Sequence, residues 1–281
     1  MLPFASLCAL LLVASGLSLH RWPRYLGALL VLLVAVLVEY VTPVFAGYLL
    51  GYLVLTAWMA EWPVRRWVRY LRYGLWFAAS VPLVIHQAPG YDGLLLAEQV
   101  TLKPDSIATD LYFNHDKIWV AWSLLAWLPL FRQSITPRRR FVAVLTPLLL
   151  VLGLGLVMLS AMALGLVQWR PGWSVWFWVF ALTNLLNTCL AEELLFRGIV
   201  LRQLLIRFGW IIALGLSGLL FGLVHFPGGW AYVLVATLAG VLYGLAYLWT
   251  GRLLWAVMVH WLLNLAHLVL FTYPMAAGYG G

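Results

Sequence analysis

Two adjacent glutamates, Glu192 and Glu193, lie in a stretch of sequence that is otherwise apolar enough to cross a membrane. Arg197 follows four residues after Glu193, and later apolar stretches contain His225 and His260. A charged side chain at the centre of a bilayer costs about 2.5–3.5 kcal/mol, so such residues are candidates for a functional site. Carboxylates combined with imidazoles suggest acid–base chemistry on a water molecule.

Helical spacing separates the roles of the two acids. Glu193 and Arg197 are four residues apart, so they share a helix face in the order that ion pairs prefer. Glu192 is turned by about 100° from that face, onto the stripe of Asn184 and Thr188, and it is the better candidate to act on water. In the alternative interpretation, both acids cap a helix at the membrane surface.

Two further motifs stand on later apolar stretches. Phe221-Gly222-Leu223-Val224-His225 ends at the helix breaker Pro227-Gly228-Gly229. His260 and Asn264 form an i, i+4 pair on one helix face, and His267 continues that stripe. Each motif alone also fits a structural role, because polar side chains in membrane helices often hydrogen-bond to a neighbouring helix.

A predicted turn at Phe208-Gly209 relates the first two motifs. Glu192 precedes this turn by about as many residues as His225 follows it, so an antiparallel pair of helices would place both at similar depth. His260 lies about nine residues beyond the predicted turn at Gly251. It reaches the same depth only if the first helical hairpin projects beyond the membrane into the cytoplasm.

The composition indicates an all-α polytopic membrane protein. Of the 281 residues, 65% are apolar and 9% are charged, and the mean hydropathy is +0.98; soluble domains carry about 25% charged residues. A spanning helix needs about 20 apolar residues, and the sequence predicts a bundle of about eight to ten such helices. The candidate spans are Phe4–Leu19, Tyr25–Val38, Pro43–Ala60, Leu75–Ala88, Ile118–Phe131, Phe141–Gln168, Ser174–Leu190, Trp210–Phe226, Ala231–Trp249 and Leu253–Phe271. Leu75–Ala88 and Ile118–Phe131 are short enough to be re-entrant or interfacial instead.

The basic residues fall in alternate loops between the spans, which predicts that these loops face the cytoplasm. They are Arg21, Arg24, Arg65, Arg66, Arg69, Arg72, Arg132, Arg138, Arg139, Arg140, Arg202, Arg207 and Arg252. The formal net charge of +8 is therefore a topology signal, and we expect no nucleic-acid partner. The preference for arginine over lysine suggests a GC-rich, bacterial genome, so we expect a multi-pass protein of the bacterial inner membrane.

At this point the chain resembles a known family. Glu-Glu-x-x-x-Arg, Phe-x-x-x-His and His-x-x-x-Asn, in this order on successive helices, are similar to the CAAX-prenyl-protease and bacteriocin-processing family of intramembrane endopeptidases. The resemblance covers roughly Phe141–Phe271, so we expect a catalytic domain over residues 141–281 and membrane helices of unknown role over residues 1–140.

The resemblance implies a glutamate-type peptidase with a helical bundle around a water-accessible, intramembrane catalytic cavity. It permits a prenylated C-terminus as the substrate, but prenylated proteins are not expected in bacteria, so we expect a membrane-tethered protein or peptide instead. It implies that Glu192 and His225 activate water, that His260 and Asn264 hold the oxyanion, and that a supporting pair stabilises the first motif. That supporting pair is Glu193 and Arg197.

Three alternatives stay open. No cofactor is expected, but Glu192, His225 and His260 also form a ligand set like that of some zinc sites; activity that is lost with a chelator and restored only by zinc would favour this version. Cys189 is a second candidate nucleophile, although buried cysteines commonly only pack. The third alternative is a non-enzymatic membrane protein: a scaffold, an immunity protein or a transporter.

Overall fold

The structure is a computed structural model that describes residues 1–128, 131, 135 and 145–279. The beginning of the predicted span Phe141–Gln168 and the basic residues Arg132, Arg138, Arg139 and Arg140 lie outside the described residues. The predicted division into 1–140 and 141–281 falls there too, and it stays a prediction. The chain forms two compact units: Met1–Ala97, Leu111–Leu130 and Leu186–Ala191 in one, and Glu98–Asp110, Phe131–Leu185 and Glu192–Gly281 in the other.

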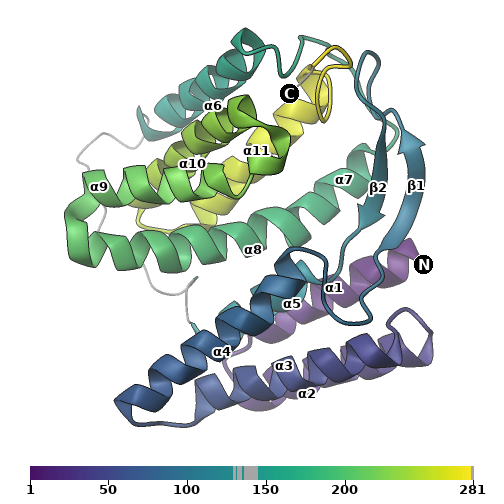
Figure 1. The fold of residues 1–281 in the computed structure, drawn as a ribbon, viewed down its shortest axis with the longest axis vertical. Helices are drawn as coiled ribbons and strands as arrows, with labels where there is room; N and C mark the ends of the chain where they lie inside the picture. The colour runs from purple at the N-terminus through teal and green to yellow at the C-terminus, as the bar shows by residue number, and fades with distance from the viewer. Residues whose placement is uncertain (129–130, 132–134, 136–144, 280–281) are drawn as a thin grey trace. The chain divides into compact units, whose positions relative to one another are not determined.

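Long apolar helices confirm the predicted all-α polytopic membrane protein. Five helices among the described residues are long and apolar enough to cross a membrane. They are α3 (Pro43–Glu61), α6 (Leu145–Ala163), the helical stretch Phe177–Leu223, α10 (Trp230–Thr250) and α11 (Leu253–Leu270). The predicted eight to ten spans also included α1 (Leu2–Gly16), α2 (Arg21–Leu37), α4 (Arg66–Val84) and α5 (Lys117–Trp127), which are shorter or carry several arginines. Figure 1 shows the order of these elements.

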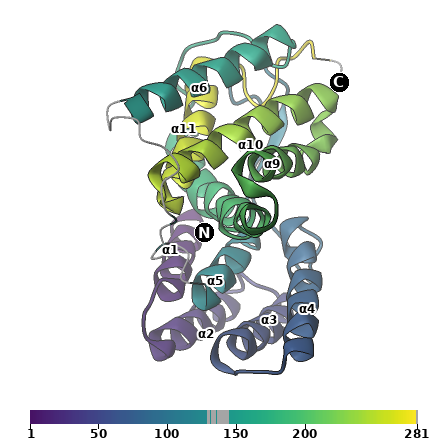
Figure 2. The same ribbon diagram turned by 90° about the vertical axis from the view of Figure 1, so that its left-hand side faces the viewer.

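The first unit is built around α5. Every residue of α5 from Ile118 to Ala126 is buried, and α1, α3 and α4 pack against it (Figure 2). Ser123 is the polar residue at its centre: its hydroxyl bonds to Thr56 Oγ1 at 2.7 Å and accepts from Trp76 Nε1 at 2.9 Å. An apolar helix of this length cannot span a bilayer; α5 is instead the core of this unit.

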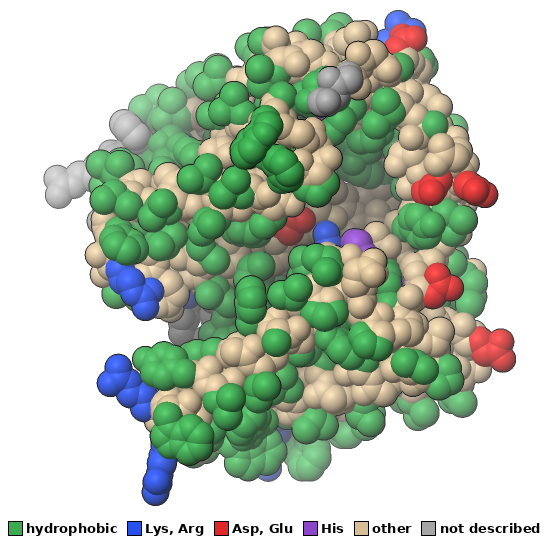
Figure 3. Space-filling model, viewed as in Figure 1, with side chains coloured by type: hydrophobic (Ala, Val, Ile, Leu, Met, Phe, Trp, Pro, Cys, Tyr) green, Lys and Arg blue, Asp and Glu red, His purple; other side chains and the backbone are tan. Residues whose placement is uncertain are grey.

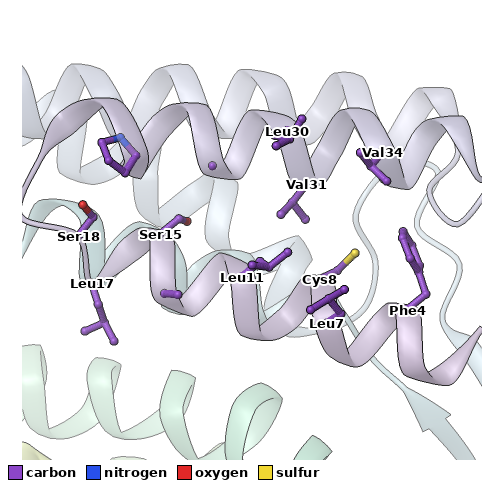
Figure 4. Close-up of a pocket in the computed structure, with 13 residues that line it drawn as sticks. Phe4, Leu7, Cys8, Leu11, Ser15, Leu17, Ser18, Leu30, Val31 and Val34 are labelled. Carbon is purple, nitrogen blue, oxygen red and sulfur yellow. The ribbon is translucent and has the colours of Figure 1, made fainter.

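A mostly apolar cavity of about 560 Å³ lies between α1 and α2. Side chains such as Cys8 and Leu11 of α1 and Val31 of α2 line it (Figure 4). The outward faces of both helices are also apolar, with Leu10 and Leu33 among the exposed residues. Such a surface is typical of helices in contact with lipid, because lipid tails are as apolar as leucine.

A buried histidine lies in the loop that precedes α5. Both ring nitrogens of His115 are buried and have no hydrogen-bond partner among the described residues. The rings of Tyr40, Tyr91 and Phe45 lie 4.6, 5.1 and 5.7 Å from the imidazole. Burial lowers the pKa of His115 from 6.5 to about 4, and the Asp116 carboxylate only partly opposes this.

We expect this histidine to make the fold sensitive to acid. Because the folded pKa is below the unfolded one, the unfolded chain binds more protons between pH 6.5 and about 4. Stability therefore falls as the pH drops through this range, by about 3 kcal/mol for this one group. We expect acidification from pH 7 to pH 4.5 to lower the unfolding temperature in detergent less for His115→Phe than for the wild type. His20→Gln, at an exposed position, is the matched control, and its unfolding temperature should drop as much as that of the wild type. An equal drop in the wild type and His115→Phe would contradict the prediction.

A β-hairpin interrupts the long connection Pro89–Lys117, where the sequence predicted no strand. β1 (Leu94–Val100) pairs with β2 (Thr109–Phe113), and Figure 1 shows the strands running in opposite directions. The burial along β1 does not alternate regularly, so period-two patterning gave no signal. The tip of the hairpin is attached within the second unit: Lys103 Nζ donates to Gly172 O at 2.6 Å and to Val269 O at 3.1 Å.

The second unit is centred on α10, which packs against α6, α9 (Arg202–Leu223) and α11. Glycines let α9 and α10 approach closely. A Cβ on Gly222 would lie 2.0 Å from Thr237 Oγ1 and 2.6 Å from Val233 O, and one on Gly218 would meet Val241 at 2.7 Å. Small residues at helix interfaces are the usual way in which membrane helices bring their backbones together.

Gly222→Ala should therefore separate α9 from α10. Because the clash includes a backbone carbonyl, we expect a loss of about 1–3 kcal/mol, the usual cost of overpacking, seen as a lower unfolding temperature in detergent. Gly215→Ala on the same helix is the control, since nothing lies within 4 Å of its new Cβ, and it should be neutral or slightly stabilising. Equal stability of the two variants would show that the approach at Gly222 is not tight.

The first motif lies on one long helical stretch with two π-helical segments. α7 (Phe177–Thr183) continues into η1 (Asn184–Cys189), α8 (Leu190–Glu193) and η2 (Leu194–Leu201). π-Helical turns are rare and often occur at functional sites. The stretch is interrupted at Gly209, whose φ of 72° and ψ of 176° are not helical, and this confirms the turn predicted at Phe208-Gly209.

Candidate active site

Three buried side chains form the centre of the candidate site. Glu193 Oε1 accepts from Arg197 Nη1 at 2.9 Å and is also 2.9 Å from His260 Nδ1. The side chains of Glu193 and Arg197 are completely buried, and that of His260 is nearly so. The predicted ion pair is confirmed, whereas the bond from His260 to the same carboxylate was not predicted from the sequence. It joins the first and third motifs across helices.

A backbone carbonyl of α10 holds Arg197 in place. Arg197 Nη2 donates to Gly240 O at 2.6 Å, on α10. Any side chain at Gly240 would crowd the guanidinium, since a Cβ there would lie 3.2 Å from Arg197 Nη2. A carbonyl and a carboxylate thus share one buried guanidinium, which offsets part of the cost of burying its charge.

Aromatic rings surround the same centre. The Phe221 ring lies 4.6 Å from Arg197 Cζ, 4.8 Å from the His225 ring and 5.8 Å from the His260 ring. Tyr243 stacks on His260 with the ring centroids 4.4 Å apart and an interplanar angle of 13°. Phe221 therefore links the second motif to the other two, and the apolar rings keep the polar centre in an environment where electrostatic interactions are strong.

His225 lies at the end of α9 and is half-buried. Its Nδ1 is 2.7 Å from Phe221 O, and its ring is 5.6 Å from the Tyr232 ring. The half-buried Glu192 lies within electrostatic range of both Tyr232 and Arg197. Tyr232 is thus a shared neighbour of the Glu192 carboxylate and the His225 imidazole.

Asn264 is positioned by an asparagine on another helix. Asn264 Nδ2 donates to Asn184 Oδ1 at 3.0 Å, and Trp261 Nε1 donates to Ala181 O at 2.8 Å. Both bonds tie α11 to the stretch that carries the first motif. Asn184 was predicted only to share a stripe with Glu192; its pairing with Asn264 needs the tertiary fold. His267, which continues the stripe of the third motif, lies 3.0 Å from Thr272 O through Nε2 and has a local structural role.

The described residues do not present a metal-binding arrangement: no three His, Cys, Asp or Glu side chains among them are grouped so that they could hold a metal ion. Glu192, His225 and His260 are thus not gathered as a metal site where the side chains are placed, and zinc dependence stays a prediction that the chelator experiment tests. Cys189, the alternative nucleophile, is fully buried.

The helices and this centre define an integral, multi-pass membrane protein with a buried acid–imidazole site. Residues 173–266 match the family model described as Rce1-like, type II CAAX prenyl endopeptidase Rce1-like. The match covers all three motifs and confirms the family resemblance predicted from them, and at the level of the family it supports a CAAX-type peptidase. No curated protein matches the chain, and no solved structure matches it.

Proposed function

We propose that the protein is an intramembrane endopeptidase that hydrolyses a peptide bond of a membrane-tethered protein or peptide. In this proposal Glu192 and His225 activate the attacking water, and His260 and Asn264 stabilise the oxyanion. Glu193 and Arg197 are positioning residues, because they act through His260 and through the fold of the first motif.

The hydrogen bonds of the two imidazoles carry the proposal. A backbone carbonyl and a carboxylate only accept hydrogen bonds, so His225 Nδ1 donates to Phe221 O and His260 Nδ1 donates to Glu193. Each imidazole is thus fixed in orientation by its Nδ1, and its Nε2 is left for chemistry. The same principle orients catalytic and metal-bound histidines in other sites.

The two histidines differ in their surroundings, which suits different roles. His225 bonds to a neutral carbonyl, so its Nε2 has a lone pair that can take a proton from water while the Glu192 carboxylate orients that water. The resulting hydroxide attacks the scissile carbonyl, and the imidazolium then returns the proton to the leaving amine. General base catalysis of this kind contributes about 10²–10⁴-fold.

His260 is held through Nδ1 by the Glu193 carboxylate. In this proposal its Nε2 is the group that donates to the oxyanion. The Asn264 amide nitrogen carries two N–H groups, so it can bond Asn184 and a second acceptor. One oxyanion donor is worth about 2.7–4 kcal/mol in systems where it has been removed.

The substrate class follows from the setting of the site. The matched family description names prenyl endopeptidases. We propose a membrane-anchored protein or peptide without a prenyl group, cut near the surface of the bacterial inner membrane, because prenylated proteins are not expected in bacteria. The lipid bilayer is then a partner of both enzyme and substrate.

The test is a comparison of membrane proteomes from cells with and without the protein. We expect at least one membrane precursor to accumulate uncut in the deleted strain and to be cut again when the wild-type gene is restored. Restoration by a variant that lacks both Glu192 and His260 would support the non-enzymatic alternative and end the peptidase proposal.

A further inference from the structure

A second polar site lies in the first unit, where α3 ends and α4 begins. A pocket of about 430 Å³ lies there, and its size is in the range of ligand-binding pockets. Its charged lining residues are Glu61, Arg69 and Arg72, and Trp62, Tyr73 and Trp127 supply aromatic walls. None of these residues belongs to the candidate active site.

Arg72 is the buried cation of this pocket, with only 6% of its surface exposed. Its Nη1 donates to Trp58 O and to Trp62 O, carbonyls at the C-terminal end of α3. A cation at that end of a helix is favourable because the terminal carbonyls have no helical partner. Among the described residues, no bond to Arg72 Nη2 occurs and no carboxylate pairs with the guanidinium. The buried Nε also has no partner there.

The other polar groups make the pocket rich in donors. Arg69 lines it one helical turn before Arg72 and is exposed. The single lining carboxylate is already engaged, since Glu61 Oε1 accepts from Tyr25 at 2.8 Å and from Arg24 at 3.4 Å. Trp127 Nε1 is a further buried donor without a partner among the described residues. A pocket with two guanidinium groups and few available acceptors suits an anion, and guanidinium matches phosphate best.

The position of the pocket favours a lipid over a soluble anion. It lies at the end of α3, one of the five helices long enough to span a membrane. Aromatic side chains are exposed around the same turn, as is typical of the membrane interface: Trp62, Trp67 and Tyr70 are each more than half exposed. Figure 3 shows basic side chains at this end of the first unit, beside a largely hydrophobic surface.

We propose that this pocket binds the phosphate of an anionic phospholipid in the cytoplasmic leaflet. The four arginines of the turn, Arg65, Arg66, Arg69 and Arg72, predict a cytoplasmic location, and anionic lipids are found in that leaflet. Arg72 contacts the phosphate from the inner wall and Arg69 from the rim, while the aromatic walls cover the glycerol and the first carbons of the acyl chains.

The test is lipid binding to the full-length, delipidated protein in detergent, counted by native mass spectrometry. We expect one phosphatidylglycerol to bind more tightly than phosphatidylcholine. Arg69→Gln should weaken that binding about fivefold, equivalent to about 1 kcal/mol. Because Arg69 is exposed, this variant is not at risk of misfolding, whereas Arg72→Gln would also remove a helix cap.

Arg66→Gln is the matched control: it removes the same charge from an exposed position one turn away that does not line the pocket. It should bind phosphatidylglycerol as the wild type does. Equal loss in Arg66→Gln and Arg69→Gln would mean general surface attraction and would overturn the site. Displacement of the lipid by inorganic phosphate at an equal concentration would mean a soluble-anion site and would overturn the lipid assignment.

Discussion

Replacing Glu192 with glutamine should abolish cleavage of the substrate, with a loss of at least about 100-fold and up to about 10⁴-fold. Glutamine has nearly the same shape, but its amide cannot serve as the carboxylate that orients and polarises the attacking water. Glu192 is half-buried and lies outside the Glu193–Arg197 pair, so the change should leave the buried centre and the fold intact. The measurement is the rate at which the uncut precursor is processed in membranes that contain equal amounts of each variant.

The control for this variant is Glu39→Gln. Glu39 is exposed in the turn between α2 and α3, so the same chemical change should leave processing unchanged there. Unfolding temperatures of both variants in detergent should match the wild type. Processing at the wild-type rate by a folded Glu192→Gln protein would remove Glu192 from the mechanism.

The second large effect is expected from the buried pair of Glu193 and Arg197. Arg197→Met keeps an unbranched side chain without its charge and leaves the Glu193 carboxylate buried with His260 as its one remaining partner among the described residues. Breaking one partner from a buried ion pair typically costs about 3–5 kcal/mol. The free energy of unfolding in detergent should fall by this amount, and processing should be lost together with the fold.

The double variant Glu193→Gln/Arg197→Met gives this prediction its test. Removing both charges leaves no uncompensated ion, and a glutamine at 193 can still accept the hydrogen bond from His260 Nδ1. The double variant should therefore be more stable than Arg197→Met alone, with a coupling energy of about 1–3 kcal/mol. If the decreases in the free energy of unfolding of Glu193→Gln and Arg197→Met simply add in the double variant, the two residues are not coupled. The 2.9 Å contact between them would then not stabilise the site.

These two experiments also separate the peptidase from its rival of another class. A scaffold, immunity protein or transporter would need the buried Glu193–Arg197 pair for its fold, so Arg197→Met would harm it as well. A scaffold or immunity protein would not need the Glu192 carboxylate, whereas a transporter would need it if it lay on an ion pathway. Loss of biological function in a stable Glu192→Gln protein thus argues against a scaffold or immunity protein, and accumulation of an uncut precursor in the same variant is the outcome that favours catalysis.

The sequence by itself determined the class of the protein and the local part of the site. Runs of apolar residues predict membrane helices because a bilayer of fixed thickness requires them. The i, i+4 spacing predicted the Glu193–Arg197 pair, and Phe208-Gly209 predicted the reversal at Gly209, because both depend on neighbours along the chain. The family match at residues 173–266 agrees with the motifs found by the same means.

Only the tertiary structure decided which partner each polar group has across helices. His260 bonds to Glu193, Asn264 to Asn184 and Arg197 to Gly240. Helical periodicity shows which face a side chain is on, but not which other helix lies opposite that face. The π-helical turns rotate the following side chains away from the positions that a regular 3.6-residue period predicts. The glycine contacts set how closely α9 and α10 approach, which the period does not predict either. For this reason the sequence predicted the candidate residues, while their partners had to come from the packing of the helices.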